Sequence, residues 1–256
     1  QDSEPLRQCE VRLNNPIEVP LGTVGTWDLP EQYIDDEGIL HTNACDDLAA
    51  VAAALCALDV LREATGGQGI HVLLTRAEEV GFIGATASCK LGWIPSGAQM
   101  LTLENSRSFP DSPIGGGPIV RVGDKVSTFS PELTAGVAQV AAELTKSDVS
   151  FNYQRKLMPG GTCEATVFFS YGYDATCVCL PLGNYHNQSD LAQVESEAPD
   201  RATVGLEYIA VADFHNLVKL LVACGDHLSE ATPYMKTIEM YYDQVGWVIE
   251  RPAFSC

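Results

Sequence analysis

The sequence predicts an α/β protein, built as a three-layer α/β/α sandwich around a mostly parallel central sheet. From residue 39 onward, short apolar runs alternate with longer segments rich in Ala and Leu. This alternation is typical of consecutive strand–helix units, whose strands lie parallel and whose helices cover both faces of the sheet. The length of 256 residues, with 46% hydrophobic, suits one large core of this kind.

Residues 1–40 differ from the rest of the chain because they are rich in Pro, Asn and Asp. Short β-like pieces such as residues 17–19 lie between turn signals, and no helical pattern is present. The segment is too short to bury its own core. We therefore expect residues 1–40 to be an arm or part of an inserted small β domain, and residues 41–256 to form the α/β domain.

The α/β part begins with a short strand at 39–42. A strong helix follows at 48–64, directly after Asp46 and Asp47. Acidic residues at a helix start interact favourably with the helix dipole and can cap it, which is the simplest explanation for this pair. The apolar run at 70–74 then predicts the next strand.

The remaining elements continue the alternation. Strands are predicted at 100–103, 119–122, 151–157 and 176–181, and helices at 85–91, 131–144, 163–171, 206–228 and 234–250. A loop at 108–117 contains prolines and a run of three glycines, and such loops commonly carry binding surfaces.

The net charge of −19 comes from 34 acidic and 15 basic residues. It argues against nucleic acid and anionic membrane surfaces as partners, since both require Lys and Arg. An acidic surface favours metal ions and substrates with a free amino group, or it simply keeps the protein in solution.

The chain shows no membrane or export signal. No apolar run approaches the ~20 residues of a membrane helix, and no basic segment followed by an apolar one opens the sequence. Nine cysteines are present without a C-x-x-C pair, and most lie in apolar runs such as 177–180. We expect reduced core cysteines and a cytoplasmic protein.

An acidic pair, Glu78 and Glu79, stands shortly after the apolar run at 70–74. Adjacent side chains point in different directions, so one carboxylate could bind a metal ion while the other acts as a general base toward water. With 34 acidic residues in 256, about four to five adjacent acidic pairs are expected by chance. The pair gains significance only from the turn with Gly81 and Gly84 that follows it, and from other candidate ligands.

Asp46, Glu104 and His186 also stand where predicted strands end, as Glu79 does. The carboxyl ends of parallel strands meet at one edge of a sheet, so these four side chains could converge. Three carboxylates and one imidazole suit zinc, cobalt or manganese, and a carboxylate shared by two ions suits a two-metal hydrolase. Each also has a purely structural explanation: a helix cap, a solvent-exposed strand end or a loop histidine.

The order of these motifs resembles that of the dinuclear zinc aminopeptidases of the glutamyl and tetrahedral aminopeptidase type. The similar motifs are, along the chain, Asp46-Asp47 at a helix start, Glu78-Glu79-Val80-Gly81 with Gly84-Ala85, Gly117-Pro118 before 120–122, Gly160-Gly161-Thr162, and the strand ending near His186. The resemblance covers about residues 40–230. It implies that residues 41–256 form a metallopeptidase-like catalytic domain.

The resemblance also implies a role for each candidate residue. Asp46 would bridge two metal ions, and Glu79 and His186 would complete one of the two sites. Glu104 would bind the second ion, in place of the family's more usual aspartate. Glu78 would be the general base of a reaction that hydrolyses N-terminal peptide bonds.

Further expectations come from the same resemblance. Gly160, Gly161 and Thr162 would line the substrate path, and the peptide bond between Asp46 and Asp47 would be cis. The cofactor would be two zinc ions, with cobalt or manganese as alternatives. The partners would be a peptide with a free N-terminus and further copies of the chain, because family members form large homo-oligomers.

Two features depart from the family pattern. Family members carry another metal-binding histidine far upstream, and the 45 residues before Asp46 hold no matching one. Cys163 and Glu164 follow the Gly-Gly-Thr motif, where the family tends to have a small or acidic pair. Three functions therefore stay open: an aminopeptidase, a non-catalytic protein of the same fold with an incomplete second metal site, and a related metal-dependent amidohydrolase or deacylase.

Overall fold

The central sheet has four strands. The computed structural model describes residues 17–65, 69–197 and 203–246. In spatial order the strands are β3 (Gln99–Arg107), β6 (Asp174–Leu182), β4 (Ile119–Gly123) and β5 (Gln154–Leu157). The β3–β6 and β4–β5 pairs are parallel, and the β6–β4 pair is antiparallel. The predicted α/β class with a mostly parallel central sheet is confirmed.

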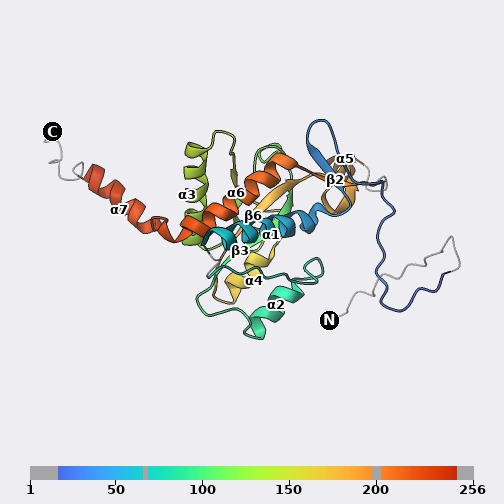
Figure 1. The fold of residues 1–256 in the computed structure, drawn as a ribbon, viewed down its shortest axis with the longest axis horizontal. Helices are drawn as coiled ribbons and strands as arrows, with labels where there is room; N and C mark the ends of the chain where they lie inside the picture. Colours follow the sequence, from blue (N-terminus) through green and yellow to red (C-terminus); the bar gives the residue numbers. More distant parts are fainter. Residues whose placement is uncertain (1–16, 66–68, 198–202, 247–256) are drawn as a thin grey trace.

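Helices cover both faces of this sheet (Figure 1). One layer consists of α1 (Cys45–Thr65), α3 (Pro131–Ser147) and α6 (Val211–His227), with α1 and α6 side by side. The other layer consists of α4 (Glu164–Ser170), which packs on β6 and β3, and α2 (Ile83–Lys90), which packs on α4. The three layers are those that the sequence predicts.

Strand β6 supplies the core of both faces. Successive side chains of a strand point to opposite sides. Val178, Leu180 and Leu182 therefore enter the apolar cluster formed with α1, α3 and α6. Cys177 and Cys179 enter a second cluster, which includes residues at the start of α4. All five side chains are fully buried, so burial at the middle of the sheet fixes the register of β6.

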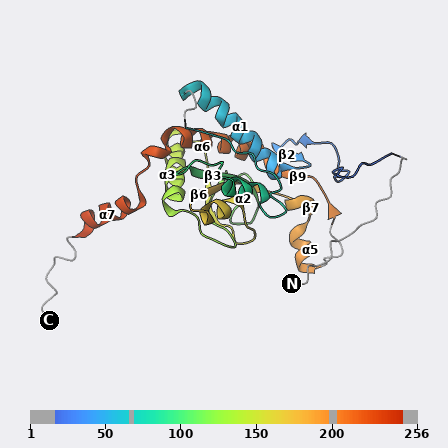
Figure 2. The same cartoon turned by 90° about the horizontal axis from the view of Figure 1, so that it is seen from below.

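Smaller elements surround this core. Strands β1 (Tyr33–Ile34), β2 (Ile39–Thr42) and β9 (Glu207–Ala210) form an antiparallel sheet in that order, and β7 (Gln188–Ser189) pairs with β8 (Thr203–Val204). Helix α5 (Leu191–Glu197) lies beside the second pair, and the short helices η1 (Tyr185–Asn187) and η3 (Leu228–Glu230) join larger elements. Helix α7 (Tyr234–Val245) extends away from the body and has no buried residue (Figures 1 and 2).

Several expected elements differ in the structure. Only residues 154–157 of the strand expected at 151–157 form a strand, and the β-like piece at 17–19 forms none. Residues 70–74 form no strand, and Leu73 and Leu74 are largely exposed. An apolar segment forms a strand only when a neighbouring strand pairs with its backbone N–H and C=O groups. In the described part of the chain, no strand pairs with residues 70–74. The predicted helix at 206–228 begins only at Val211, because residues 207–210 pair with β2 as β9.

Some predictions fall on residues outside the described ranges: residues 1–16 of the N-terminal segment and the end of the last helix at 247–250. The division of the chain at residue 40 stays a prediction. The seven cysteines of the described part have free thiols, and five of them are buried. Within the same part, no helix combines the length and apolarity needed to cross a membrane.

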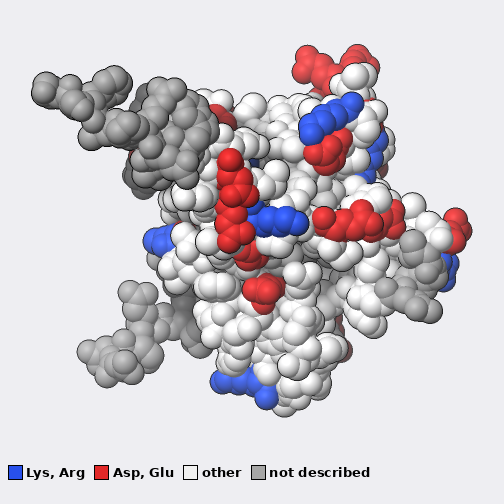
Figure 3. Space-filling model, turned by 90° about the vertical axis from the view of Figure 1, so that its left-hand side faces the viewer, with Lys and Arg blue, Asp and Glu red and all other residues white. Residues whose placement is uncertain are grey.

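Charged side chains of both signs occur on the surface. On the face shown in Figure 3, acidic and basic groups stand among uncharged ones. Several oppositely charged neighbours on the surface form ion pairs, such as Lys219 with Asp148 at 2.6 Å. With 34 acidic and 15 basic residues in the chain, such pairs balance only part of the acidic surplus.

We predict that Leu180→Ala destabilises the fold strongly. Leu180 of β6 is fully buried, and truncation leaves a cavity between the sheet and its helices. The free energy of unfolding should fall by about 2–5 kcal/mol, measured by urea denaturation. Val149→Ala is the control, because Val149 is fully exposed, and it should change stability by less than about 0.5 kcal/mol. Equal effects of the two substitutions would contradict the assignment of β6 to the core.

Candidate metal centre

The site is built on the turn that starts α1. The peptide bond between Asp46 and Asp47 is cis, as the resemblance implies, and both residues have non-helical backbone angles. Glu207 of β9, which is 2% exposed, accepts a hydrogen bond from the Asp46 backbone N–H at 2.9 Å. Asn105 of β3 donates to the Cys45 carbonyl and to Asp47 Oδ1, both at 2.8 Å. The turn is therefore fixed by two strands and is more than a helix cap.

Three predicted ligands converge beside this turn. His186 Nε2 lies 3.6 Å from Asp46 Oδ2 and 3.6 Å from Glu79 Oε2. One ligand atom from each of the three residues lies within 4.8 Å of the others. The Asp46 side chain is 5% exposed, whereas the side chains of His186 and Glu79 are 43% and 58% exposed. Two carboxylates and an imidazole, open to solvent on one side, fit a divalent metal ion with a free coordination position.

His186 is held in an unusual backbone conformation. Its φ of 55° lies in the left-handed region, and its neighbours Asn184 and Asn187 have similar angles. The Asn184 amide donates to the Leu206 carbonyl at 2.8 Å, and the Tyr185 ring stacks on the imidazole with 3.9 Å between centroids. Left-handed backbone is costly for a residue with a Cβ and persists where surrounding contacts impose it. These contacts aim the imidazole at Asp46.

The turn after Glu78 and Glu79 is equally constrained. The Glu78 carbonyl accepts hydrogen bonds from the backbone of Gly81 and Phe82. Gly84 donates to the Arg76 carbonyl, and a Cβ on Gly84 would lie 2.5 Å from the Arg76 backbone nitrogen. Only glycine allows this close approach. The turn with Gly81 and Gly84 thus holds Glu78 and Glu79 next to the start of α2.

Burial and mutual repulsion shape the electrostatics of the site. Burial, followed by the charge of Glu79, raises the pKa of Asp46 to about 9. Burial and the charge of Glu78 raise the pKa of Asp47 to about 8. Burial and the charge of Glu79 raise the pKa of Glu78 to about 7. These carboxylates lack sufficient positive charge around them, and a bound divalent ion would relieve the repulsion.

Glu104 is not part of this close group of three ligands, but it lies near Asp46. Its carboxyl has a pKa well above the usual range, because it is buried and because Asp46 is nearby. Arg121 of β4 is a neighbouring buried cation, 3% exposed, whose Nη1 donates to Ser106 Oγ at 3.2 Å. Arg121 Nε has no hydrogen-bond partner in the described part of the chain.

The Gly-Gly-Thr segment lies next to the histidine turn. A Cβ on Gly161 would be 3.8 Å from the Tyr185 hydroxyl, and the Gly161 carbonyl accepts a hydrogen bond from the Lys125 backbone. Asp124 anchors the end of the segment by accepting from the Cys163 backbone N–H at 3.1 Å. A role of Gly160, Gly161 and Thr162 in the substrate path stays a prediction, and their position beside the metal centre is compatible with it.

Sequence reasoning missed three residues of the site: Asn105, Arg121 and Glu207. A signal was present for two of them: Glu207 is a charged residue in an apolar run, and Arg121 interrupts an apolar strand. Asn105 gave no comparable signal, because a polar residue is expected at the end of a strand.

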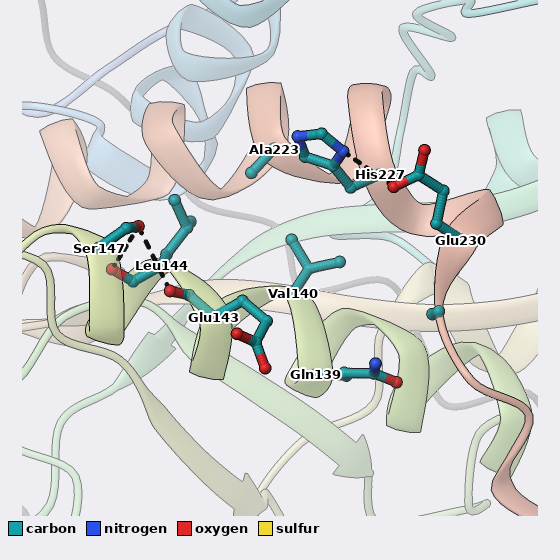
Figure 4. Close-up of a pocket in the computed structure, with 9 residues that line it drawn as sticks. Gln139, Val140, Glu143, Leu144, Ser147, Ala223, His227 and Glu230 are labelled. Carbon is teal, nitrogen blue, oxygen red and sulfur yellow. Dashed lines mark hydrogen bonds and ion pairs between the residues drawn. The ribbon is translucent and has the colours of Figure 1, made fainter.

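A separate hollow of about 410 Å³ lies between α3 and α6 (Figure 4). Apolar and polar side chains line it, including Val140, Leu144 and Glu143, and His227 Nδ1 lies 3.3 Å from Glu230 Oε2 at its rim. None of the predicted site residues lines this hollow. It therefore has no part in the chemistry of the metal centre.

Comparisons with known proteins agree with this geometry. A family model described as M42 glutamyl aminopeptidase matches residues 14–198. A search of curated proteins found no match.

Solved structures with the same fold include three archaeal peptidases. An aminopeptidase from Desulfurococcus kamchatkensis is 18% identical, with a TM-score of 0.59, over 81% of this chain and 55% of that one. A TET aminopeptidase from a marine sediment archaeon of the Thaumarchaeota is 18% identical, with a TM-score of 0.59, over 78% and 54%. The Pyrococcus horikoshii TET1 peptidase is 18% identical, with a TM-score of 0.53, over 76% and 52%. This chain spans about half the length of each.

We predict that Asn105→Ala weakens binding of a divalent ion at the centre. The substitution removes the hydrogen bonds that Asn105 donates to the Cys45 carbonyl and to the Asp47 carboxylate, on either side of Asp46. Loss of a residue that orients metal ligands typically lowers metal affinity by about 10–100-fold. Competition with a zinc chelator measures the affinity. Gln139→Ala on α3 removes a comparable side-chain hydrogen bond outside the site and should leave the affinity unchanged; equal affinities for the two variants would contradict the prediction.

Proposed function

The chain belongs to the M42 glutamyl aminopeptidase family, whose model matches residues 14–198, and on this basis we propose that it is a metal-dependent aminopeptidase. The observation that carries the proposal is the convergence of Asp46, Glu79 and His186, with Glu78 adjacent. The substrate would be a peptide with a free N-terminus, and the reaction would be hydrolysis of its first peptide bond.

The proposed metal ligands divide into two sets. Asp46, Glu79 and His186 would hold one ion, and Asp46 with Glu104 would contribute to a second. Zinc suits this mixture of carboxylates and imidazole, with cobalt or manganese as alternatives. The bound metal would supply a Lewis acid that polarises the scissile carbonyl and makes water acidic.

Glu78 would move the protons of the reaction. Its carboxylate would accept a proton from the attacking water and then deliver it to the nitrogen of the leaving amine. The raised pKa of about 7 supports this double role, since a group that titrates near neutral pH can both accept and donate a proton. Its neighbour Glu79 points toward His186, so the two carboxylates of the pair have separate tasks.

The surroundings of the centre support a substrate with a positive charge. Asp47 and Glu78 lie beside Asp46 of the proposed centre, and the chain has a net charge of −19. A free α-amino group would be attracted to such a site. Gly160, Gly161 and Thr162 would border the path by which the peptide enters.

A non-catalytic protein of the same fold is the second candidate. One observation favours it. Within the described residues, one group of three ligands lies close enough together to hold a metal ion, whereas the proposed enzyme would use two ions. A related amidohydrolase or deacylase would use the same chemistry on another amide. We also propose a homo-oligomer, because the solved structures of this fold include a TET1 peptidase described as able to assemble into a tetrahedron or a large octahedral shell. The free thiols of the seven described cysteines support a cytoplasmic location.

We predict that Glu78→Gln abolishes hydrolysis without loss of metal. The amide cannot accept the proton, so kcat should fall by about 10²–10⁴-fold on aminoacyl p-nitroanilides. Glu79→Gln is the matched comparison: it should instead lower metal affinity, measured by chelator competition. Undiminished hydrolysis by the Glu78→Gln variant would remove Glu78 as the base.

Metal analysis separates the candidate functions. We expect chelator treatment to abolish hydrolysis and zinc, cobalt or manganese to restore it. Elemental analysis of the reloaded protein should give two ions per chain if Glu104 takes part in binding, and one if it does not. A protein that binds no metal would contradict the proposed function, and hydrolysis of N-acyl but not free aminoacyl substrates would favour a deacylase.

A further inference from the structure

Tyr185 lies beside the metal centre and has no role in the chemistry above. It is the first residue of η1 and directly precedes the proposed ligand His186. Its ring stacks on the imidazole, with 3.9 Å between the ring centroids and 25° between the ring planes. The stacking fixes the phenol ring against the ligand, and the hydroxyl at the far end of the ring takes no part in it.

The Tyr185 hydroxyl is an accessible donor. In the described part of the chain it has no hydrogen-bond partner, and it is not one of the three unpartnered side-chain atoms there that are fully enclosed. A Cβ on Gly161 would lie 3.8 Å from the hydroxyl, and a Cβ on Gly160 would meet no atom within 4 Å apart from those of its chain neighbours. Open space therefore borders the hydroxyl on the side of the Gly-Gly-Thr segment.

The imidazole connects the phenol ring to the other proposed ligands. His186 Nε2 lies 3.6 Å from Asp46 Oδ2 and 3.6 Å from Glu79 Oε2, while the Tyr185 ring covers one face of the same imidazole. Burial, followed by the charge of Asp46, raises the pKa of the hydroxyl, in keeping with this position. Because the hydroxyl also approaches Gly161, the Tyr185 side chain extends from the ligand group to the predicted substrate path.

The centre is rich in acceptors and poor in donors. Five carboxylates belong to it or lie near it: Asp46, Asp47, Glu78, Glu79 and Glu104. Arg121 is buried, and its Nη1 donates to Ser106. Hydrolysis of a peptide bond places negative charge on the carbonyl oxygen, which donors or cations stabilise. The Tyr185 hydroxyl is a donor that can meet this oxygen without first giving up a hydrogen bond within the described chain.

We propose that the Tyr185 hydroxyl donates a hydrogen bond to the oxygen of the scissile carbonyl as negative charge develops on it. This inference rests on the proposed aminopeptidase function and adds a catalytic residue to it. A hydrogen bond to a charged oxygen is stronger than one to the neutral carbonyl of the bound substrate. The hydroxyl would therefore accelerate the chemical step and contribute little to substrate binding.

The test compares the zinc-loaded full chain with its Tyr185→Phe variant, which keeps the stacked ring and loses the hydroxyl. The substrate is the best of a panel of aminoacyl p-nitroanilides. We expect kcat to fall by about 10²–10³-fold, as for the loss of one donor to a developing oxyanion. KM should change by less than about threefold, and zinc affinity, measured by chelator competition, should stay the same.

Tyr241→Phe is the matched control, because it removes a hydroxyl from a 64% exposed side chain of α7, outside the site. It should leave kcat, KM and zinc affinity unchanged. A purely structural role of Tyr185 would reside in the stacked ring, so the Tyr185→Phe variant would then keep its full activity. A kcat for Tyr185→Phe within about twofold of the wild-type value would overturn the proposal.

A binding measurement keeps this inference separate from the proposed function. The hydrates of α-amino aldehydes carry two oxygens on a tetrahedral carbon, whereas the corresponding amino acid amides keep a neutral carbonyl. Isothermal titration of the zinc-loaded chain should show aldehydes of the panel binding about tenfold more weakly to Tyr185→Phe than to the wild type, and amides binding equally to both.

The combined results separate the two hypotheses. If the wild-type chain hydrolyses no substrate of the panel but the tenfold difference in aldehyde affinity is present, the proposed function fails and the hydroxyl stands as a donor to a ligand oxygen. If the wild type hydrolyses substrates and Tyr185→Phe changes neither kcat nor aldehyde affinity, the role of Tyr185 fails alone. Absence of both hydrolysis and the affinity difference would refute both.

Discussion

Repulsion between closely spaced carboxylates is the constraint on which the structure depends. Asp46, Asp47 and Glu78 are brought together so that burial and neighbouring charges raise the pKa of each. Such a grouping is unfavourable unless the fold imposes it or a cation compensates it. The fold imposes it through backbone hydrogen bonds to Glu207 and Asn105, and the chemistry of the donors points to a divalent ion as the compensating charge.

The sandwich supplies the rigidity that this arrangement needs. Strand β6 is buried along almost its whole length and ends just before the histidine turn, so the position of His186 is tied to the best-packed part of the core. Asp213 of α6 is buried and accepts hydrogen bonds from the backbone N–H groups of Gly115 and Gly117, in the loop before β4, at 2.7 Å each. Gly117 has a φ of 86°, and a Cβ at this position would clash with the Asn152 carbonyl, so only glycine fits. The loops around the site are thus held by the same core.

Most of the fold follows from local sequence patterns. Apolar alternation and helix-start signals gave the central strands and the helices α1, α3 and α6, because these elements bury faces whose period is visible in the chain. The strand expected at 70–74 was wrong for the opposite reason: its apolar residues satisfy the pattern, but a strand also needs a partner, which no local pattern specifies. The helix expected from residue 206 failed similarly, since pairing with β2 draws residues 207–210 into β9.

The sequence by itself determined the element types, the order of the motifs and the residues able to act as ligands or base. The tertiary structure decided which of them meet: Asp46, Glu79 and His186 form a close group, and Glu104 lies near Asp46. It also identified Glu207 and Asn105, which reach the Asp46–Asp47 turn across 161 and 58 residues of chain. Helix and strand patterns reflect interactions between near neighbours, whereas contacts between distant segments depend on how the whole core packs, and only the folded chain specifies them.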